Sequence, residues 1–141
     1  MLNSGVLALA SGLAAQAFKI VIALVFRRRW QPGLFFANGG MPSSHAATVT
    51  TLSLLIGRQE GYMSSLFSIS LIFSIFIIME ATGLRQEIGK QAQLLNELMD
   101  GVLAHRRLDQ KRLRELVGHT WGEVGGGIVF GAVFYLLVIR L

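Results

Sequence analysis

The sequence predicts an all-α integral membrane protein. We expect a helical bundle of about four transmembrane helices, with a re-entrant loop and an amphipathic interfacial helix. The chain is 52% hydrophobic and only 15% charged, with a mean hydropathy of +0.56. That composition is too apolar for an ordinary soluble domain. The 141 residues allow a single domain, residues 1–141, with room for three or four membrane helices.

Composition also excludes several classes of function. The chain has no cysteine, so disulfides and thiolate metal sites are absent. No GxxxxGK[ST] loop and no GxGxxG turn is present, which excludes the common nucleotide-binding motifs. The net charge of +5 is better explained by membrane topology and lipid contact than by nucleic-acid binding. We therefore expect the lipid bilayer as a partner and no nucleic acid.

The first predicted helix covers residues 4–26 and is long enough to cross a bilayer. It lacks the basic start and small-residue cleavage pattern of a signal peptide, so we keep it as a mature helix. Its one charge before the end is Lys19, with Gln16 on the same face. Lys19 lies roughly 12 Å deeper along the axis than Arg27. At that depth a polar partner or a bound anion is at least as plausible as snorkelling to the interface.

The middle of the chain alternates anchors, loops and helices. Arg27, Arg28, Arg29 and Trp30 form an interface anchor. The apolar loop 31–41 is predicted to dip into the membrane or pack on the bundle. A short helix, 44–56, and a helix that is apolar except for its serines, 62–79, follow. The second ends at Glu80, a carboxylate that is costly there unless it is paired or hydrated.

The C-terminal third begins with an amphipathic stretch, residues 86–105. Ile88, Ala92 and Leu95 share its apolar face, which predicts a helix at the interface or docked beneath the bundle. A last helix is predicted to run to residue 139. Its Gly127 and Gly131 form a GxxxG pair that would allow close helix packing, and a homo-oligomer is one arrangement it would support.

The positive charges predict the topology. Ten of the thirteen basic residues lie in residues 27–29 and 85–114. Four crossings place both clusters on one side, and the positive-inside rule makes that side cytoplasmic, or stromal in a plastid. The same arrangement brings His45, Glu80, Arg85 and His119 to one interface. We predict this group of polar side chains as the functional site.

Residues 38–45 suggest what chemistry this site performs. Gly39 and Gly40 free the backbone, and Ser43 and Ser44 are good N-cap residues, so His45 should lie in the first turn of a helix. Backbone N–H groups and the helix dipole make such a turn attractive to an anion, while an imidazole can move a proton. Phosphate chemistry fits these features. A merely capped helix that carries a histidine fits them too.

Four segments, in order, resemble a known family. They are GGMPSSH at 39–45, ATGLR at 81–85, QAQLLN at 91–96 and GHTWGEV at 118–124. They are similar to a divergent family related to type 2 phosphatidic acid phosphatase and vanadium-dependent haloperoxidase. The similarity covers nearly the whole chain. In the wider superfamily a KxxxxxxRP motif, a PSGH motif and an SRxxxxxHxxxD motif form one phosphate pocket.

The resemblance implies roles for individual residues. PSSH at 42–45 matches PSGH, so Ser43, with the backbone after it, would hold phosphate oxygens and His45 would protonate the leaving group. HTWGE at 119–123 matches HxxxD with glutamate for aspartate, so His119 would be the nucleophile and Glu123 its orienting carboxylate. Independently, residues i and i+4 are neighbours on a helix, where a carboxylate can fix the imidazole tautomer.

Other positions depart from the superfamily pattern. Lys19 stands for the lysine of the first motif, but no Arg-Pro follows it at the expected spacing. Leu113 stands where the third motif has arginine, which leaves Arg85, Arg112 and Arg114 as candidates for the phosphate clamp, with Ser44 beside them. Glu80 occupies a place where the family commonly has aspartate.

These observations imply a membrane phosphatase without metal or other cofactor. It would hydrolyse a lipid or prenyl phosphate monoester, or a diphosphate, through a histidine nucleophile. Two alternatives remain open. One is a membrane scaffold of the same fold that is catalytically weak or inactive. The other is a metal-assisted phosphohydrolase in which His45, Glu80 and His119 hold a divalent ion.

Overall fold

The structure is a computed structural model, which describes residues 3–28, 30, 32–36, 40–103 and 119–140. Its α-helices are α1 (Ser4–Arg27), α2 (Ser44–Glu60), α3 (Ser65–Met79), α4 (Arg85–Leu103) and α5 (Trp121–Val138). A short 3-10 helix, η1 (Pro32–Phe36), follows α1, and a π-helical turn, η2 (Glu80–Leu84), joins α3 to α4. The described part of the chain contains no β-strand. The all-helical prediction is therefore confirmed.

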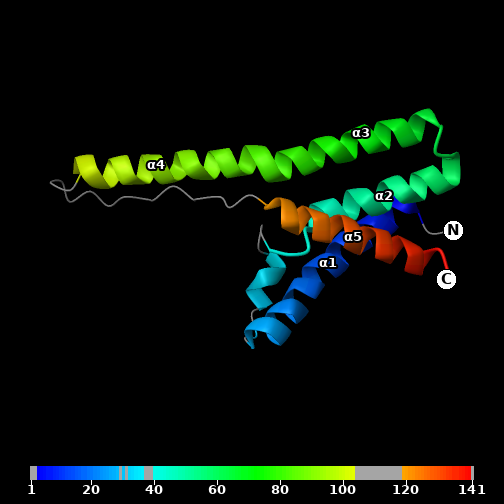
Figure 1. The fold of residues 1–141 in the computed structure, drawn as a ribbon, viewed down its shortest axis with the longest axis horizontal. Helices are drawn as coiled ribbons and strands as arrows, with labels where there is room; N and C mark the ends of the chain where they lie inside the picture. The colour runs from blue at the N-terminus through cyan, green and yellow to red at the C-terminus, as the bar shows by residue number, and fades with distance from the viewer. Residues whose placement is uncertain (1–2, 29, 31, 37–39, 104–118, 141) are drawn as a thin grey trace.

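Helix α2 lies at the centre of the bundle and packs against α1, α3 and α5 (Figure 1). Ser43 caps its start, and Gly61, with a φ of 90°, follows its end. The helix extends one turn beyond the predicted residue 56, because Gly57 does not break it and instead lies buried against Tyr62 and Phe67. Its buried side chains are mostly small or hydroxylated, which lets three neighbours approach closely.

The bundle buries hydroxyl groups and exposes large apolar side chains. On α3, Phe73 and Phe76 are exposed, whereas Ser70 and Ser74 are buried. The Ser53 hydroxyl of α2 lies 2.9 Å from that of Ser70 and 2.8 Å from that of Ser74. Apolar side chains on the outside and hydrogen-bonded hydroxyls between helices are expected where the surrounding solvent is lipid.

Helix α5 approaches α2 through the predicted glycine pair. A Cβ at Gly131 would lie 2.6 Å from the Ala47 carbonyl oxygen, and one at Gly127 would collide with the Ser43 carbonyl oxygen. The Thr51 hydroxyl donates a hydrogen bond of 3.0 Å to the Gly131 carbonyl. Close packing through this pair is confirmed. It occurs within one chain, and a homo-oligomer through this pair stays a prediction.

Three helical segments in the described part of the chain are long and apolar enough to cross a membrane. They are Ser4–Val25, Ser65–Met99 and Trp121–Val138. Helix α2, predicted as a further crossing, is not among them. Because α2 is covered by three other helices, its side chains face protein instead of lipid and need not be strongly apolar. The chain is an integral membrane protein with three candidate spans.

The predicted amphipathic helix does not dock beneath the bundle, and its alternative placement at the membrane interface stays a prediction. Through the π-helical turn η2, α4 continues α3 as one long rod that projects beyond the bundle (Figure 1). Of the three residues named on its apolar face, Ile88 and Leu95 are exposed and Ala92 is buried. The prediction of docking beneath the bundle was wrong, because the chain does not turn at the end of α3.

The loop before α2 packs on the bundle. Its 3-10 helix η1 contacts α1, as expected of an apolar loop that covers protein. Gly40, with a φ of 92°, then leads into α2. Whether this loop enters the bilayer stays a prediction.

Candidate active site

His45 lies in the first turn of α2, as predicted from the two serines. Ser43 is the N-cap, and its hydroxyl oxygen accepts a hydrogen bond of 3.4 Å from the backbone N–H of Ala46. The Ser43 N–H donates to the Glu123 carbonyl oxygen at 3.0 Å. The start of α2 is therefore fixed directly to the start of α5.

His119 lies outside a helix, which corrects the geometry that the sequence suggested. Thr120 is the N-cap of α5, so His119 is the residue before the cap. Its backbone N–H donates to the Ala81 carbonyl oxygen at 3.0 Å, which ties it to the π-helical turn. The residue is only 2% exposed. Three segments far apart in the sequence thus meet at His119.

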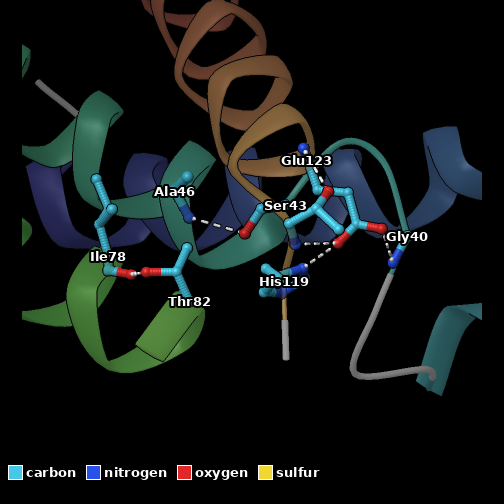
Figure 2. A network of polar contacts seen from close by, with 8 residues as sticks. Gly40, Ser43, Ala46, Ile78, Thr82, His119 and Glu123 are labelled. Carbon is cyan, nitrogen blue, oxygen red and sulfur yellow. Dashed lines mark hydrogen bonds and ion pairs between the residues drawn. The ribbon is translucent and has the colours of Figure 1, made fainter. Parts of the chain in front are cut away.

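Glu123 connects His119 with the loop before α2 (Figure 2). Its Oε2 lies 3.0 Å from His119 Nδ1 and accepts the Thr120 backbone N–H at 3.1 Å. Its Oε1 accepts the Gly40 backbone N–H at 3.2 Å. The Thr120 hydroxyl in turn accepts the Glu123 N–H at 3.3 Å, which completes a capping box. The carboxylate is held on both oxygens before any ligand arrives.

This contact determines which nitrogen of the His119 ring carries the proton and which keeps its lone pair. An ionised carboxylate only accepts hydrogen bonds, so Nδ1 must carry the proton that it shares with Glu123. In the neutral ring, Nε2 is then the unprotonated nitrogen. Nε2 is buried and has no hydrogen-bond partner among the described residues. The ring of His45 lies edge-on, with centroids 5.8 Å apart and an interplanar angle of 66°.

The side chain of Lys19, on α1, lies close to Gly40. The residue is 3% exposed, and its Cδ would be 3.8 Å from a Cβ built on Gly40. Its burial near Gly40 agrees with the interpretation that Lys19 is held within the protein instead of snorkelling to the interface.

A groove of about 400 Å³ opens on the far side of His45. It lies between α1, α2 and α3, and His45 and Ser44 form part of its wall. The complete lining is Leu9, Gly12, Leu13, Gln16, Ser44, His45, Thr48, Val49, Phe73 and Ile77. His45 thus borders the groove and also faces His119.

Residues 3–134 match the sequence model of the Divergent PAP2 family. The chain belongs to this family. A relative, described as the uncharacterized membrane protein YuiD of Bacillus subtilis (strain 168), is 36% identical over an alignment that covers 92% of this chain and 89% of that protein. No solved structure matches. The resemblance seen in the sequence is confirmed.

In this member of the Divergent PAP2 family, the structure explains why residue 123 is glutamate and not aspartate. A capping box needs a side chain long enough to reach back from the third helical position to the cap, which glutamate achieves. The contact with His119 therefore comes from a carboxylate folded back over the helix start. It does not come from two neighbours on one helical face.

Sequence reasoning missed two positions in this network, Thr120 and Gly40. Thr120 carries a readable signal, because threonine followed three residues later by glutamate is the capping-box pattern. Gly40 was recognised only as a source of backbone freedom. Its N–H contact with Glu123 needs the tertiary fold, which brings residues 40 and 123 together.

Of the remaining predicted site residues, the structure describes the side chain of Glu80. Glu80 lies in the π-helical turn with an exposed side chain. Arg112 and Arg114 lie outside the described residues, and so does the side chain of Arg85. Within the described residues, no three histidine or carboxylate side chains are grouped closely enough to hold a metal ion. The set of His45, Glu80 and His119 is thus not assembled as a metal site.

Proposed function

We propose that this protein is a membrane-embedded phosphatase that hydrolyses a lipid or prenyl phosphate monoester, or a diphosphate, with His119 as the nucleophile. The observation that carries the proposal is the imidazole of His119. Glu123 holds its Nδ1 at 3.0 Å, its Nε2 is buried with no partner among the described residues, and the ring centroid lies 5.8 Å from that of His45. A carboxylate-oriented imidazole is the arrangement that a histidine nucleophile needs.

The reaction follows from these positions. His119 Nε2 attacks phosphorus, and the bond from phosphorus to the lipid oxygen breaks. His45 gives its proton to the departing alkoxide, which leaves as an alcohol. Water then attacks the phosphohistidine, His45 accepts the water's proton, and inorganic phosphate leaves. Glu123 stabilises the positive charge that the His119 ring carries in the phosphoenzyme.

The phosphate would be held by groups that already surround the two rings. Lys19 supplies a buried positive charge on the side of Gly40. The backbone N–H groups of the first turn of α2 supply donors, and the helix dipole favours an anion there. Ser43 uses its hydroxyl oxygen to cap α2, which leaves its O–H free to donate to a phosphate oxygen.

Phosphate release from a panel of lipid and prenyl phosphates by the purified protein tests the proposal. We expect release that vanadate inhibits, since vanadate mimics five-coordinate phosphate, and that EDTA leaves intact. His119→Asn, which keeps a polar side chain of similar size, should abolish turnover without lowering the thermal midpoint much. Full release by this variant would show that His119 is not the nucleophile. Loss with EDTA and recovery with magnesium would establish the metal-assisted alternative.

A second candidate is a catalytically weak or inactive scaffold of the same fold. The burial of His119 favours it, because substrate would need the helix ends to separate before phosphorus could reach Nε2. The same panel decides between the two. A folded protein that releases no phosphate from any lipid, at any detergent or lipid composition, would establish the scaffold.

A further inference from the structure

A π-helical turn interrupts the rod formed by α3 and α4 at the place where the rod contacts His119. In this turn, η2, backbone N–H groups donate to the carbonyl five residues back, whereas in α3 and α4 they donate to the carbonyl four residues back. Where the wide spacing returns to the ordinary one, the series of hydrogen bonds skips one carbonyl, which is then available to a donor outside the helix. A π-helical turn can therefore bind a neighbouring segment in a way that a regular helix cannot.

The carbonyl group of Ala81, inside the turn, has such an outside donor. The backbone N–H of His119 donates to its oxygen at 3.0 Å. Both residues are buried, so water does not compete for this hydrogen bond. Ala81 thus fixes the backbone of His119, while Glu123 fixes its Nδ1 at 3.0 Å. The side chain of His119 is held at both of its ends.

The side chain of Thr82 stabilises the turn. Thr82 is 5% exposed, and its hydroxyl donates to the carbonyl oxygen of Ile78 at 2.9 Å (Figure 2) and to that of Met79 at 3.3 Å. These two carbonyls belong to the last turn of α3, where the hydrogen-bond spacing changes. A threonine hydroxyl that donates to the carbonyl four residues back bends a helix. The Thr82 hydroxyl therefore favours the wide turn over a regular one.

We infer that η2 positions the His119 ring and that Thr82 is the positioning residue. Its hydroxyl keeps the turn wide, and the wide turn keeps the Ala81 carbonyl within reach of the His119 N–H. Thr82 acts through these two residues and takes no part in the bond changes. The inference rests on the proposed function for the chemistry at Nε2, but not for the geometry. It gives a role to the segment ATGLR at 81–85, which the phosphate chemistry leaves unexplained.

Hydrogen exchange at the His119 backbone amide, in the full-length protein in nanodiscs, tests the inference. Labelling with ¹⁵N-histidine gives three backbone amide signals, because the chain has three histidines, and the His119 signal is the one that His119→Asn removes. Thr82→Val keeps the shape of the side chain but removes the hydroxyl, and should speed exchange of this amide roughly tenfold or more. Thr82→Ser, which keeps the hydroxyl, should restore slow exchange.

Ser68→Ala is the matched control. The Ser68 hydroxyl also donates to the carbonyl four residues back, that of Ser64, at 3.1 Å, but it lies at the end of α3 away from η2. Its loss should leave His119 exchange unchanged.

The ¹⁵N shifts of the neutral His119 ring supply a second measurement. The wild type should show a protonated Nδ1 and an unprotonated Nε2, whereas in Thr82→Val both nitrogens should shift toward a mixture of the two tautomers. A loss of stability alone would lower the unfolding midpoint and leave the ring of the folded molecules unchanged.

Several results would overturn the inference. In the folded wild type, fast exchange of the His119 amide would do so whatever the variants show. Unchanged exchange or ring shifts in Thr82→Val, no recovery in Thr82→Ser, or an equal change in Ser68→Ala would each do so as well.

Phosphate release connects the turn with the proposed reaction. The kcat of Thr82→Val should fall roughly tenfold with KM unchanged, and an unchanged kcat in a protein that releases phosphate would overturn the role of the turn in the reaction. Exchange and ring shifts are measured without substrate. The expected NMR pattern in a protein that releases no phosphate would therefore refute the phosphatase and leave the positioning of His119 by η2 standing.

Discussion

Glu123 fixes the tautomer of His119, and a single atom change tests this role. Glu123→Gln keeps the side-chain length and an oxygen for the capping box, but its amide can present N–H groups to Nδ1. The proton of His119 would then move to Nε2, where it blocks attack. We expect phosphate release to fall by roughly 10²- to 10⁴-fold, the range that proton-managing groups contribute. The measurement is the initial rate at saturating lipid substrate.

The control for this substitution is Thr120→Val, which removes the hydroxyl that caps α5 but keeps the carboxylate. It should lower stability by about 1 kcal/mol and retain most of the release rate. A Glu123→Gln protein that keeps the wild-type rate would contradict the assignment of the tautomer to Glu123.

His45 is expected to matter in proportion to the basicity of the leaving group. Its position in the first turn of α2 disfavours the charged ring, because the positive end of the helix dipole lies there. The substrate phosphate supplies the opposing charge. His45→Ala should slow release from lipid alcohols by roughly 10²-fold or more, and should slow release from p-nitrophenyl phosphate much less. Equal slowing of both substrates would argue against an acid role.

Much of this residue-level arrangement could be predicted from the chain. His45 in a first helical turn follows from two capping serines, and the pairing of His119 with Glu123 follows from their spacing. The reason for that pairing could not be predicted in full, because it depends on where α5 begins. Glu80 was expected at the site from its position at a helix end. Its exposed side chain shows that helix-end position alone does not fix where a side chain points.

At the scale of the helices, the packing of α5 on α2 holds together the start of α2, which carries His45, and the start of α5, which follows His119. Gly131→Ala places a methyl group about 2.6 Å from the Ala47 carbonyl oxygen, a contact that only helix separation relieves. We expect a loss of roughly 1–3 kcal/mol. Gly125→Ala, on the same helix with no atom within 4 Å of the added Cβ, should be neutral or slightly stabilising. Unfolding in SDS, followed by circular dichroism, measures both.

If both alanine variants unfold at the same SDS fraction, close packing at Gly131 contributes nothing to the bundle. A loss of phosphate release in Gly131→Ala, together with the loss of stability, would further link this packing to the site. The Gly125→Ala variant is the control for any general effect of an added alanine in α5.

The helices themselves were largely predictable, since apolar length and capping residues are local properties. The predicted starts at residues 4 and 44 agree with α1 and α2. The direction of α4 was not predictable. Its amphipathic pattern is compatible both with an interfacial helix and with an extension of α3, and the π-helical turn that selects the extension has no clear sequence signal. Likewise, the mild polarity of α2 gave no sign that three helices cover it.

Over the whole molecule, the residues of the candidate site gather at one end of the bundle. The starts of α2 and α5 and the end of α3 meet around His119 through the Glu123, Ser43 and Ala81 contacts. The opposite end is marked by the Ser4 hydroxyl, which donates to Gln59 at 2.6 Å. Because the candidate site lies at one end of the bundle, we expect it at one face of the membrane. The basic residues around Arg28 predict that this face is the cytoplasmic, or stromal, one.

Single cysteines test this orientation cleanly, because the chain contains none. A cysteine at Arg28, after α1 and at the end that carries the site, should be shielded from an impermeant thiol reagent added outside intact cells. A cysteine at Met63, which is 98% exposed beyond the end of α2, should be labelled from outside. Permeabilisation should make both reactive, which controls for a cysteine that is simply hidden. The reverse pattern would invert the topology and place His45 and His119 on the outer face. Labelling of both in intact cells would show that α1 and α2 do not place these positions on opposite sides of the membrane.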